Sequence, residues 1–527
     1  MQLNNYARTR QYLVGLSLFI AVLVAHLYLT SVSPYLDEGD HANTGRLLAH
    51  GRLIYQDAFN EKGPGLYWIT AGLFTVFGDR FAVMRHAAAS GMLASLLLIF
   101  ALAWKYGRPN VGLAAGAIFA AFHLFLLGEF WQSESLLTPL ALAVWYLLSS
   151  DAEGDHPAPW KFAAAGLALY VATCVKQTAW WLVLGVVAAT LIEGRANRAW
   201  AWFKSLLAFG GGLAAPWALT LLMVRAQGNW GPFVEGYLFP LTLFGWGAYV
   251  EGPGVDDFFL EAPAWWMTAA ALIAVARKQM DLPSWDRSVF SAVLCAVVLM
   301  VTQALFAHHF LPVLAIASVG FSAAVLSKPR VRRWPLRPVL LVGFLALAVA
   351  AAGYMPDRFR YRVARFDAGD RQQVAARVTA TTSPDDPVFV FPHDSTYYYL
   401  THREPPGRYG FLLPWTTPPL VLDRVQAEFA ARPPALILYT YLANCTPTGM
   451  SPAEYLAPFL HRLTTTYRLE QIFPNRVALL RRIETANAAA AKDQTRLERL
   501  FSLGSAYCWG PAERVRQFVT KDRGAAR

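Results

Sequence analysis

Charged residues are scarce in this chain. They make up 15% of its 527 residues, whereas hydrophobic residues make up 55%. A soluble protein of this length carries roughly 25% charged residues. Apolar runs of about 18 residues or more recur through the first two thirds of the sequence, and each is long enough to cross a membrane. The composition therefore excludes an ordinary soluble enzyme and predicts a mainly α-helical, polytopic membrane protein.

Cysteine is also rare, with four in the whole chain. Cys174 and Cys295 fall within apolar runs, where a cysteine usually packs as a small hydrophobic residue. Cys445 and Cys508 fall in the C-terminal part, and we expect them to form a disulfide bond if that part lies outside the cytoplasm. No two cysteines have the spacing of a zinc site.

Signatures of nucleotide and nucleic-acid binding are missing too. The chain has no P-loop and no dinucleotide fingerprint, and it has no zinc-finger or RNA-recognition motif. Its net charge of +11 comes largely from basic residues in predicted cytoplasmic loops, where membrane orientation and anionic lipid explain them. We therefore predict no nucleic-acid partner.

About eleven membrane-spanning helices are predicted, and the first is expected to remain as an uncleaved span. Residues 64–78 are apolar, but as a helix they would reach about 22 Å, too short for a hydrocarbon core of roughly 30 Å. We expect this segment to lie along the membrane interface. The predicted spans are residues 11–32, 81–103, 110–127, 134–150, 162–176, 178–193, 204–224, 264–277, 288–306, 310–327 and 337–353.

This assignment gathers Lys and Arg in the loops on one side of the membrane. The positive-inside rule then places the N-terminus in the cytoplasm and residues 33–80 outside it. Residues 1–353 are predicted to form the membrane domain, and residues 354–527 a small extracytoplasmic α/β domain. Apolar runs at 387–391 and 435–439 predict strands. Further predicted elements are helices at 371–379 and 423–431 and a hairpin formed by 471–473 and 477–480.

Acidic residues follow the first predicted span directly, at Asp37, Glu38 and Asp40. Charged groups at a membrane edge are costly and mark functional sites, and a carboxylate can take a proton from an acceptor hydroxyl. The alternatives are a solvated loop or a helix cap, and for Asp40 we favour a cap before His41. Glu134 begins the fourth predicted span, where it is either a second functional acid or a first-turn residue that favours the helix dipole.

Basic residues stand at the outer ends of the predicted spans. Lys62 opens a segment that continues to Trp68, Lys176 interrupts an apolar stretch, and His308 and His309 lie between two spans. An ammonium or imidazole group at the interface can hold a phosphate, although ordinary headgroup contact is the alternative for Lys62. The two histidines have no evident third ligand for zinc.

Together these segments resemble the GT-C class of integral-membrane glycosyltransferases, in the branch of protein O-mannosyltransferases, lipid A aminoarabinose transferases and lipopolysaccharide-core transferases. The resemblance covers the order of the spans, Asp37-Glu38, the Lys62–Trp68 segment and Glu134. The family segment is Lys-Pro-Pro-Leu-Tyr-Tyr-Trp. Pro64, Tyr67 and Trp68 match it, whereas the residues that depart from it are Gly63, Gly65 and Leu66.

The resemblance implies inverting transfer of a sugar from a polyprenyl-phosphate donor to a glycolipid, polysaccharide or protein acceptor, at the outer face of a bacterial inner membrane. The residues implied to act in catalysis are Asp37, Glu38 and Glu134. Those implied to bind the donor phosphate are Lys62, Lys176, His308 and His309. Those implied to line the lipid groove are Pro64, Tyr67 and Trp68. No cofactor is required, and a divalent cation, if bound, would lie between Asp37 and Glu134.

Two other functional classes remain open. A transporter or flippase for a lipid-linked saccharide would explain the spans and the basic residues, but it predicts internal repeats and polar residues at mid-membrane. A membrane scaffold would leave the acidic and Lys62 segments unexplained. The long loop at 226–262, which carries Asp256 and Asp257, could close over the lipid. For Arg408 we favour an exposed position over contact with an acceptor.

Overall fold

In a computed structural model of the protein, the chain divides into two compact units. Unit 1 comprises Met1–Ser31, Lys62–Trp230 and Gly252–Arg360, and unit 2 comprises Val32–Glu61, Gly231–Glu251 and Tyr361–Arg527. The residues whose placement is described are 2–30, 36–150, 157–194, 199–238, 255–276, 284–301, 307–326, 338–350, 353, 368–412, 419–440, 456–474, 477–483 and 494–501. Cys445 and Cys508 lie outside these residues, so their predicted disulfide stays a prediction.

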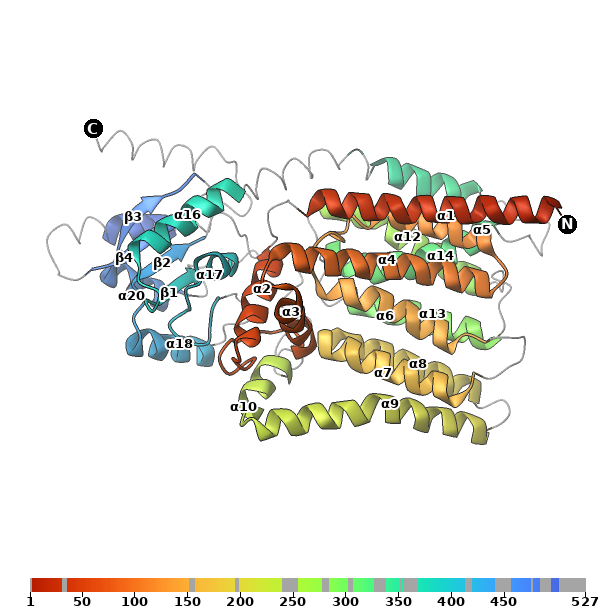
Figure 1. The fold of residues 1–527 in the computed structure, drawn as a ribbon, viewed down its shortest axis with the longest axis horizontal. Coiled ribbons are helices and arrows are strands. Elements are labelled where there is room, and N and C mark those ends of the chain that lie inside the picture. The colour runs from red at the N-terminus through yellow and green to blue at the C-terminus, as the bar shows by residue number, and fades with distance from the viewer. Residues whose placement is uncertain are drawn as a thin grey trace. The chain divides into compact units, whose positions relative to one another are not determined.

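Unit 1 is helical, and most of its helices run alongside one another as a bundle (Figure 1). The helices of its first half are α1 (Gln2–Leu29), α3 (Pro64–Phe77), α4 (Phe81–Lys105), α5 (Pro109–Phe122), α6 (Ser133–Leu148) and α7 (Pro159–Val175). Those of its second half are η1 (Gln177–Ala179), α8 (Trp180–Gly194), α9 (Ala199–Ala226), α12 (Val255–Ala276), α13 (Ser284–Val301), η3 (Ala307–Phe310) and α14 (Leu311–Leu326). A further apolar helix covers Pro338–Ala350.

Each predicted span overlaps one of these helices. Among the described residues, four helical stretches are long and apolar enough to cross a membrane, namely Thr9–Leu29, Phe81–Lys105, Trp200–Ala226 and His308–Leu326. Other apolar helices are shorter than predicted; α5, for example, ends at Phe122. One loop prediction is wrong, because α12 begins at Val255 and therefore includes Asp256 and Asp257.

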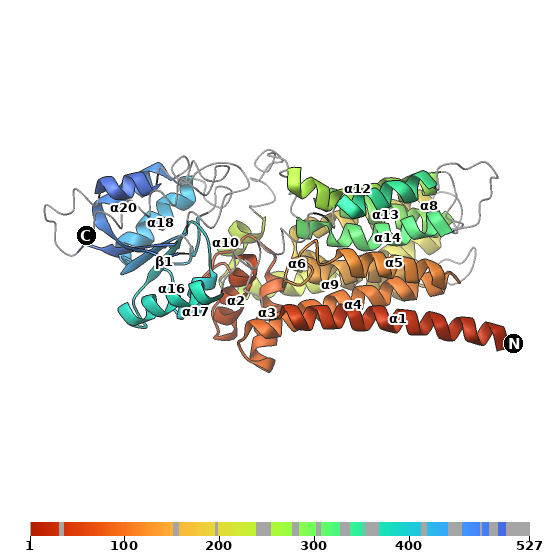
Figure 2. The ribbon, with the colours of Figure 1, turned by 90° about the horizontal axis from the view of Figure 1, so that it is seen from above.

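Helix α3 is the short helix predicted at 64–78, and Figures 1 and 2 show that it crosses the direction of the long helices at one end of the bundle. Pro64 stands in its first turn, where the missing N–H costs nothing. Gly63 and Gly65 pack on the end of α7. A Cβ on Gly63 would lie 1.9 Å from the carbonyl oxygen of Cys174, and one on Gly65 would lie 2.9 Å from the Cys174 Cβ. The departures from the family segment therefore allow two backbones to approach closely.

Unit 2 is built around a four-stranded sheet of order β1-β2-β4-β3. Strand β1 (Val388–Phe391) pairs in parallel with β2 (Leu436–Tyr439). Strands β2 and β3 (Tyr467–Ile472) both pair antiparallel with β4 (Ala478–Arg482). The two predicted strands and the predicted hairpin are therefore confirmed. The helices of this unit are α2 (Leu36–Ala49), η2 (Val234–Leu238), α16 (Ala368–Thr381), α17 (Thr396–Thr401), α18 (Pro419–Ala431) and α20 (Ala457–Thr466). The short helix α10 (Trp230–Phe233) has its first residue in unit 1 and the others in unit 2.

Alternation along the strands gives the sheet two apolar faces. Phe389 and Phe391 point to a cluster with residues of α18 and α20. Val388 and Val390 point to a second cluster with residues of α16 and α17. Neighbouring strand residues face opposite sides of the sheet. Helices cover both sides, so each side of the sheet has its own buried hydrophobic core.

Two segments from before the predicted boundary at residue 353 belong to unit 2. Helix α2 packs closely on α17, since a Cβ on Gly39 would lie 2.0 Å from the Thr396 hydroxyl oxygen. The backbone N–H of Phe59 donates to the carbonyl of Arg408 at 2.9 Å. Unit 2 thus joins the segment after the first predicted span to the C-terminal part of the chain.

The close contact at Gly63 generates a testable prediction. Replacing Gly63 with Ala forces a methyl group against the Cys174 carbonyl, so we expect a destabilisation of about 1–3 kcal/mol, as for other overpacked positions. Gly72, in the same helix, has no atom within 4 Å of its Cβ position, so Gly72→Ala is the matched control and should stabilise by about 0.5–1 kcal/mol. Thermal unfolding of the detergent-solubilised protein measures both, and equal melting temperatures for the two variants would contradict the packing argument.

Candidate functional site

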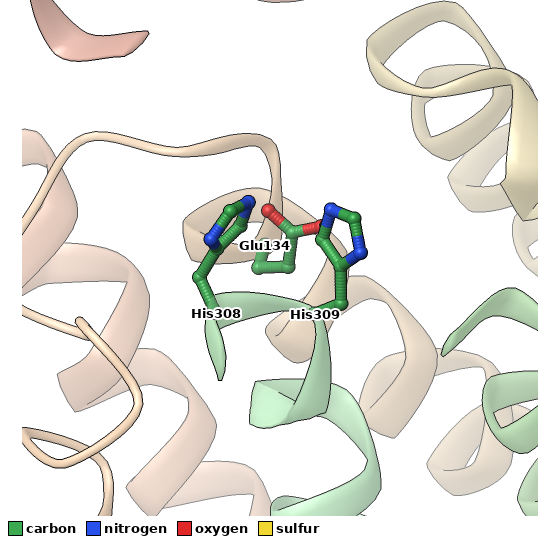
Figure 3. Close-up of side chains that lie close together, drawn as sticks. All are labelled: Glu134, His308 and His309. Atoms are coloured by element: carbon green, nitrogen blue, oxygen red, sulfur yellow. The ribbon is translucent and has the colours of Figure 1, made fainter. Parts of the chain in front are cut away.

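Four residues predicted from the ends of separate spans lie together in unit 1. Glu134 is in the first turn of α6, and Lys176 directly follows α7. His308 and His309 belong to η3, just before α14. Figure 3 shows the Glu134 carboxylate between the two imidazole rings, which project from one turn of the chain toward it.

The Glu134 carboxylate is the centre of this cluster. The Lys176 ammonium donates to Glu134 Oε1 at 2.5 Å, and His309 Nε2 lies 3.7 Å from the same oxygen. The Ser133 hydroxyl donates to Oε2 at 2.9 Å. The side chains of Glu134 and Lys176 are only 2% and 13% exposed. Removing two charges from water is costly, so such a pair persists only when the charges meet in good geometry with further hydrogen bonds.

The loop before α6 is fixed by contacts with other helices of unit 1. The indole N–H of Trp131 donates to the Thr70 hydroxyl in α3 at 2.9 Å. The Arg85 guanidinium of α4 lies 4.3 Å from the centre of the Phe130 ring, a cation–π contact. The Ser135 hydroxyl accepts from the backbone N–H of Gln132 and donates to the carbonyl of Phe130. These contacts set the direction in which α6 starts and so place Glu134.

The cluster can hold either an anion or a metal ion. Glu134, His308 and His309 each offer a ligand atom, and these atoms lie within 4.8 Å of one another. The expectation that the histidines lack a third ligand is therefore wrong, because Glu134 supplies one from a distant part of the sequence. The Lys176 ammonium already contacts this carboxylate and would repel a divalent cation. An incoming phosphate would instead meet the ammonium and the imidazoles, which are all potential donors.

Lys62 and the predicted lipid-groove residues lie at the start of α3. Lys62 immediately precedes Gly63, whose backbone touches Cys174, two residues before Lys176. Pro64 is buried and Tyr67 is fully buried, whereas Trp68 keeps part of its surface exposed. Of these aromatic side chains, Trp68 is the one whose surface can contact a lipid.

The first acidic segment lies in unit 2. Asp37 and Glu38 are in the first turn of α2, with Asp37 partly exposed and Glu38 fully buried. Asp40 is not a cap, because α2 begins at Leu36. Its carboxylate instead accepts a hydrogen bond from the Asn60 amide at 2.6 Å. Asp37 is therefore the most accessible of the three carboxylates.

We expected Arg408 to be exposed, but its side chain is partly buried. Its guanidinium and that of Arg424 each donate to Glu235 Oε2 at 2.6 Å, and the Tyr409 hydroxyl donates to Glu235 Oε1 at 2.5 Å. Burial by itself would raise the pKa of Glu235, but the hydrogen bonds from Tyr409 and Arg408 outweigh it and lower that pKa below its usual value. The cluster ties η2 to the C-terminal part of unit 2, and no motif in the sequence predicts this pairing.

Parts of the sequence and the overall fold are similar to those of known proteins. The profile of the dolichyl-phosphate-mannose-protein mannosyltransferase family matches residues 61–223, a stretch that includes Lys62, Glu134 and Lys176. The crystal structure of ArnT from Cupriavidus metallidurans bound to undecaprenyl phosphate superposes with a TM-score of 0.58 at 15% identity, over 89% of this chain and 98% of that one. The chain has the GT-C fold.

Two further similarities agree with the GT-C assignment. The Archaeoglobus fulgidus oligosaccharyltransferase, tethered to an acceptor peptide, gives a TM-score of 0.52 at 11% identity, over 89% of this chain and 74% of that one. An undecaprenyl phosphate-alpha-4-amino-4-deoxy-L-arabinose arabinosyl transferase of Pseudomonas fluorescens is 26% identical over 227 residues. That match spans 41% of this chain and 38% of the relative.

The buried ion pair leads to a prediction about stability. Lys176→Met leaves the Glu134 carboxylate buried without its ammonium partner, so we expect a loss of about 3–5 kcal/mol. Glu134→Gln added to Lys176→Met should recover much of this loss, because a neutral amide is cheaper to bury than a carboxylate. Thermal unfolding in detergent measures both. Lys204→Met, which removes an exposed lysine of α9, is the control and should change stability by less than about 0.5 kcal/mol. A double variant as unstable as the single one would refute the pairing.

Proposed function

We propose that this protein is a glycosyltransferase that moves a sugar from a polyprenyl-phosphate-sugar donor to an acceptor at the outer face of a membrane, with inversion. The observation that carries the proposal is the convergence of Lys176, His308 and His309 on Glu134. The GT-C fold supports it, as do the matching family and relative, which are named for mannosyl and aminoarabinosyl transfer. The similar structure of ArnT was determined with undecaprenyl phosphate bound.

The proposed topology follows the sequence. The chain would cross a bacterial inner membrane about eleven times, with its N-terminus in the cytoplasm and the sheet-bearing unit 2 in the periplasm. Helix α3 would lie in the outer interface, where Trp68 contacts lipid. The cluster around Glu134 would then stand at the outer ends of the spans, at the depth of a lipid phosphate.

Lys176 would bind the donor phosphate together with Lys62, His308 and His309. Before transfer the phosphate links the sugar to the polyprenyl chain and carries one negative charge. When the bond from the anomeric carbon to the phosphate oxygen breaks, its electron pair stays on that oxygen and the phosphate gains a second charge. Cations held at this place in advance stabilise the added charge.

Glu134 would orient these cations rather than act as the base. Its Oε1 already accepts from Lys176 and its Oε2 from Ser133, so both oxygens have partners. Asp37 is the better candidate for the base because it is the accessible carboxylate of α2. It would take the proton from the acceptor hydroxyl or amine while the acceptor atom bonds to the anomeric carbon.

The role of Asp37 is tested by Asp37→Asn, which keeps the size of the side chain but removes the base. We expect transfer to fall by about 10²–10⁴-fold, with unchanged thermal stability and unchanged binding of polyprenyl phosphate. Asp40→Asn is the matched control, since its amide oxygen can still accept from Asn60, and we expect it to retain most activity. The assay uses a radiolabelled polyprenyl-phosphate sugar and membrane acceptors.

Full transfer by the Asp37→Asn variant would overturn the assignment of the base. The unaltered protein is tested in vesicles as well. If it moves label across the vesicle membrane but forms no new glycosidic bond, the protein is a flippase rather than a transferase. If the label neither crosses nor reacts, it is a scaffold.

A divalent cation is not required in this mechanism, because the ammonium of Lys176 supplies the charge that a metal would otherwise provide. We expect EDTA to leave the rate within about twofold, while added Zn²⁺ inhibits by binding Glu134, His308 and His309 in place of phosphate. Rates measured after chelation and after metal addition check this. Loss of activity with EDTA and its recovery with Mg²⁺ would show that the cation is essential.

A further inference from the structure

Unit 1 has a slot between α8 and α13, which lie side by side (Figure 2). Its volume is about 610 Å³. Small residues form its middle, including Gly185, Ala188, Ala292 and Ala296. Cys295 also lines the slot and is exposed, whereas Cys174, the other cysteine in an apolar run, is buried.

The two ends of the slot differ in chemistry. Trp181 and Leu299 line one end, whereas Glu193, Arg287 and Ser288 line the other. The Ser288 hydroxyl donates to Glu193 Oε1 at 2.6 Å, which joins the last turn of α8 to the first turns of α13. A slot with an apolar body and a charged end has the polarity of a single lipid molecule.

Charges of both signs gather at this polar end. Arg287 lies near the N-terminus of α13, where the helix dipole favours an anion, and Glu193 lies near the C-terminus of α8, where the dipole favours a cation. A phosphate is therefore stabilised on the side of α13 and an ammonium on the side of α8. A headgroup that carries one phosphate and one ammonium complements both.

The charged end is far from the proposed donor site. Lys176 precedes α8, so it stands at the Trp181 end of the slot. Trp181 and Glu193 are twelve positions apart in the helix, or about 18 Å along its axis. One phosphate cannot occupy both places, so a lipid with its head at Glu193 and Arg287 is distinct from the sugar donor.

We propose that the α8–α13 slot binds one phosphoethanolamine-type phospholipid. Its phosphate is held by Arg287, its primary ammonium by Glu193 and Ser288, and one acyl chain lies over the small residues of the slot. The amine supplies three N–H donors, whereas a choline headgroup has the same charge and no N–H. Charge-assisted hydrogen bonds from the ammonium therefore make the site selective for the amine.

Cys295 provides a built-in reporter for this lipid. The detergent-solubilised full-length protein is treated with N-ethylmaleimide while lipid is titrated, and modification of Cys295 is measured by peptide mass spectrometry. The four probes are phosphatidylethanolamine, phosphatidylcholine and phosphatidylglycerol of the same acyl chains, and polyprenyl phosphate. We expect phosphatidylethanolamine to protect Cys295 at a concentration about tenfold lower than phosphatidylcholine does.

Variants separate the two halves of the headgroup. Glu193→Gln should bring the two lipids to nearly equal protection, whereas Arg287→Gln should weaken both by about tenfold. Ala188→Trp fills the slot from an exposed position of α8 and should abolish protection by either lipid. Lys204→Gln, which removes a positive charge from α9, is the matched control and should leave the selectivity unchanged.

Equal protection by the ethanolamine and choline lipids in the unaltered protein overturns the proposal, and this comparison does not depend on any variant folding. Stronger protection by phosphatidylglycerol would show an anion site instead. Protection by polyprenyl phosphate alone would assign the slot to the donor chain. The lipid proposal rests on none of the steps of sugar transfer, and none of these measurements requires transfer. The lipid proposal can therefore fail while the proposed function stands, and the proposed function can fail while the lipid proposal stands.

Discussion

The arrangement of the candidate site depends on the buried ion pair between Glu134 and Lys176. Neither charge is tolerated alone in a bundle of apolar helices, so the start of α6 and the end of α7 must stay together. The same carboxylate draws His309 to within 3.7 Å. One carboxylate thus brings three segments that are distant in sequence to one place, and it holds an ammonium whose side chain is only 13% exposed.

In the proposed function, the pair would also prepare the site for phosphate. A lysine held by a carboxylate keeps its position before the ligand arrives, so less conformational entropy is lost on binding. The carboxylate lowers the net positive charge of the empty site, and the phosphate gains charge only as the sugar leaves. Stabilisation that grows along the reaction accelerates it more than tight binding of the donor would.

Sequence was sufficient to find the members of the site but not their contacts. Glu134, Lys176 and the two histidines were recognisable because a charged or titratable residue at the end of an apolar run is costly and so stands out. The pair of Glu134 and Lys176 joins residues 42 positions apart, and no local pattern encodes it. Strands β1 and β2 were visible as apolar runs, whereas the tie between Glu235 and Arg408 depends on tertiary packing. In the sequence, Gly63 and Gly65 stand out only because they differ from the family segment. In the structure both pack against Cys174, which leaves no room for a side chain at either position.

The two ends of α8 place different demands on lipid chemistry. At the first, Lys176, His308 and His309 surround one carboxylate, and this surplus of donors would suit the proposed donor phosphate, whose charge increases during transfer. At the other, Glu193 and Arg287 balance each other, and each lies where its helix dipole favours a ligand charge opposite to its own. An end with one acidic and one basic residue does not favour a ligand whose charge changes during a reaction. It suits a headgroup that carries one positive and one negative charge at all times. The same helix can therefore adjoin a reacting lipid at one end and a resident lipid at the other, with little competition between them.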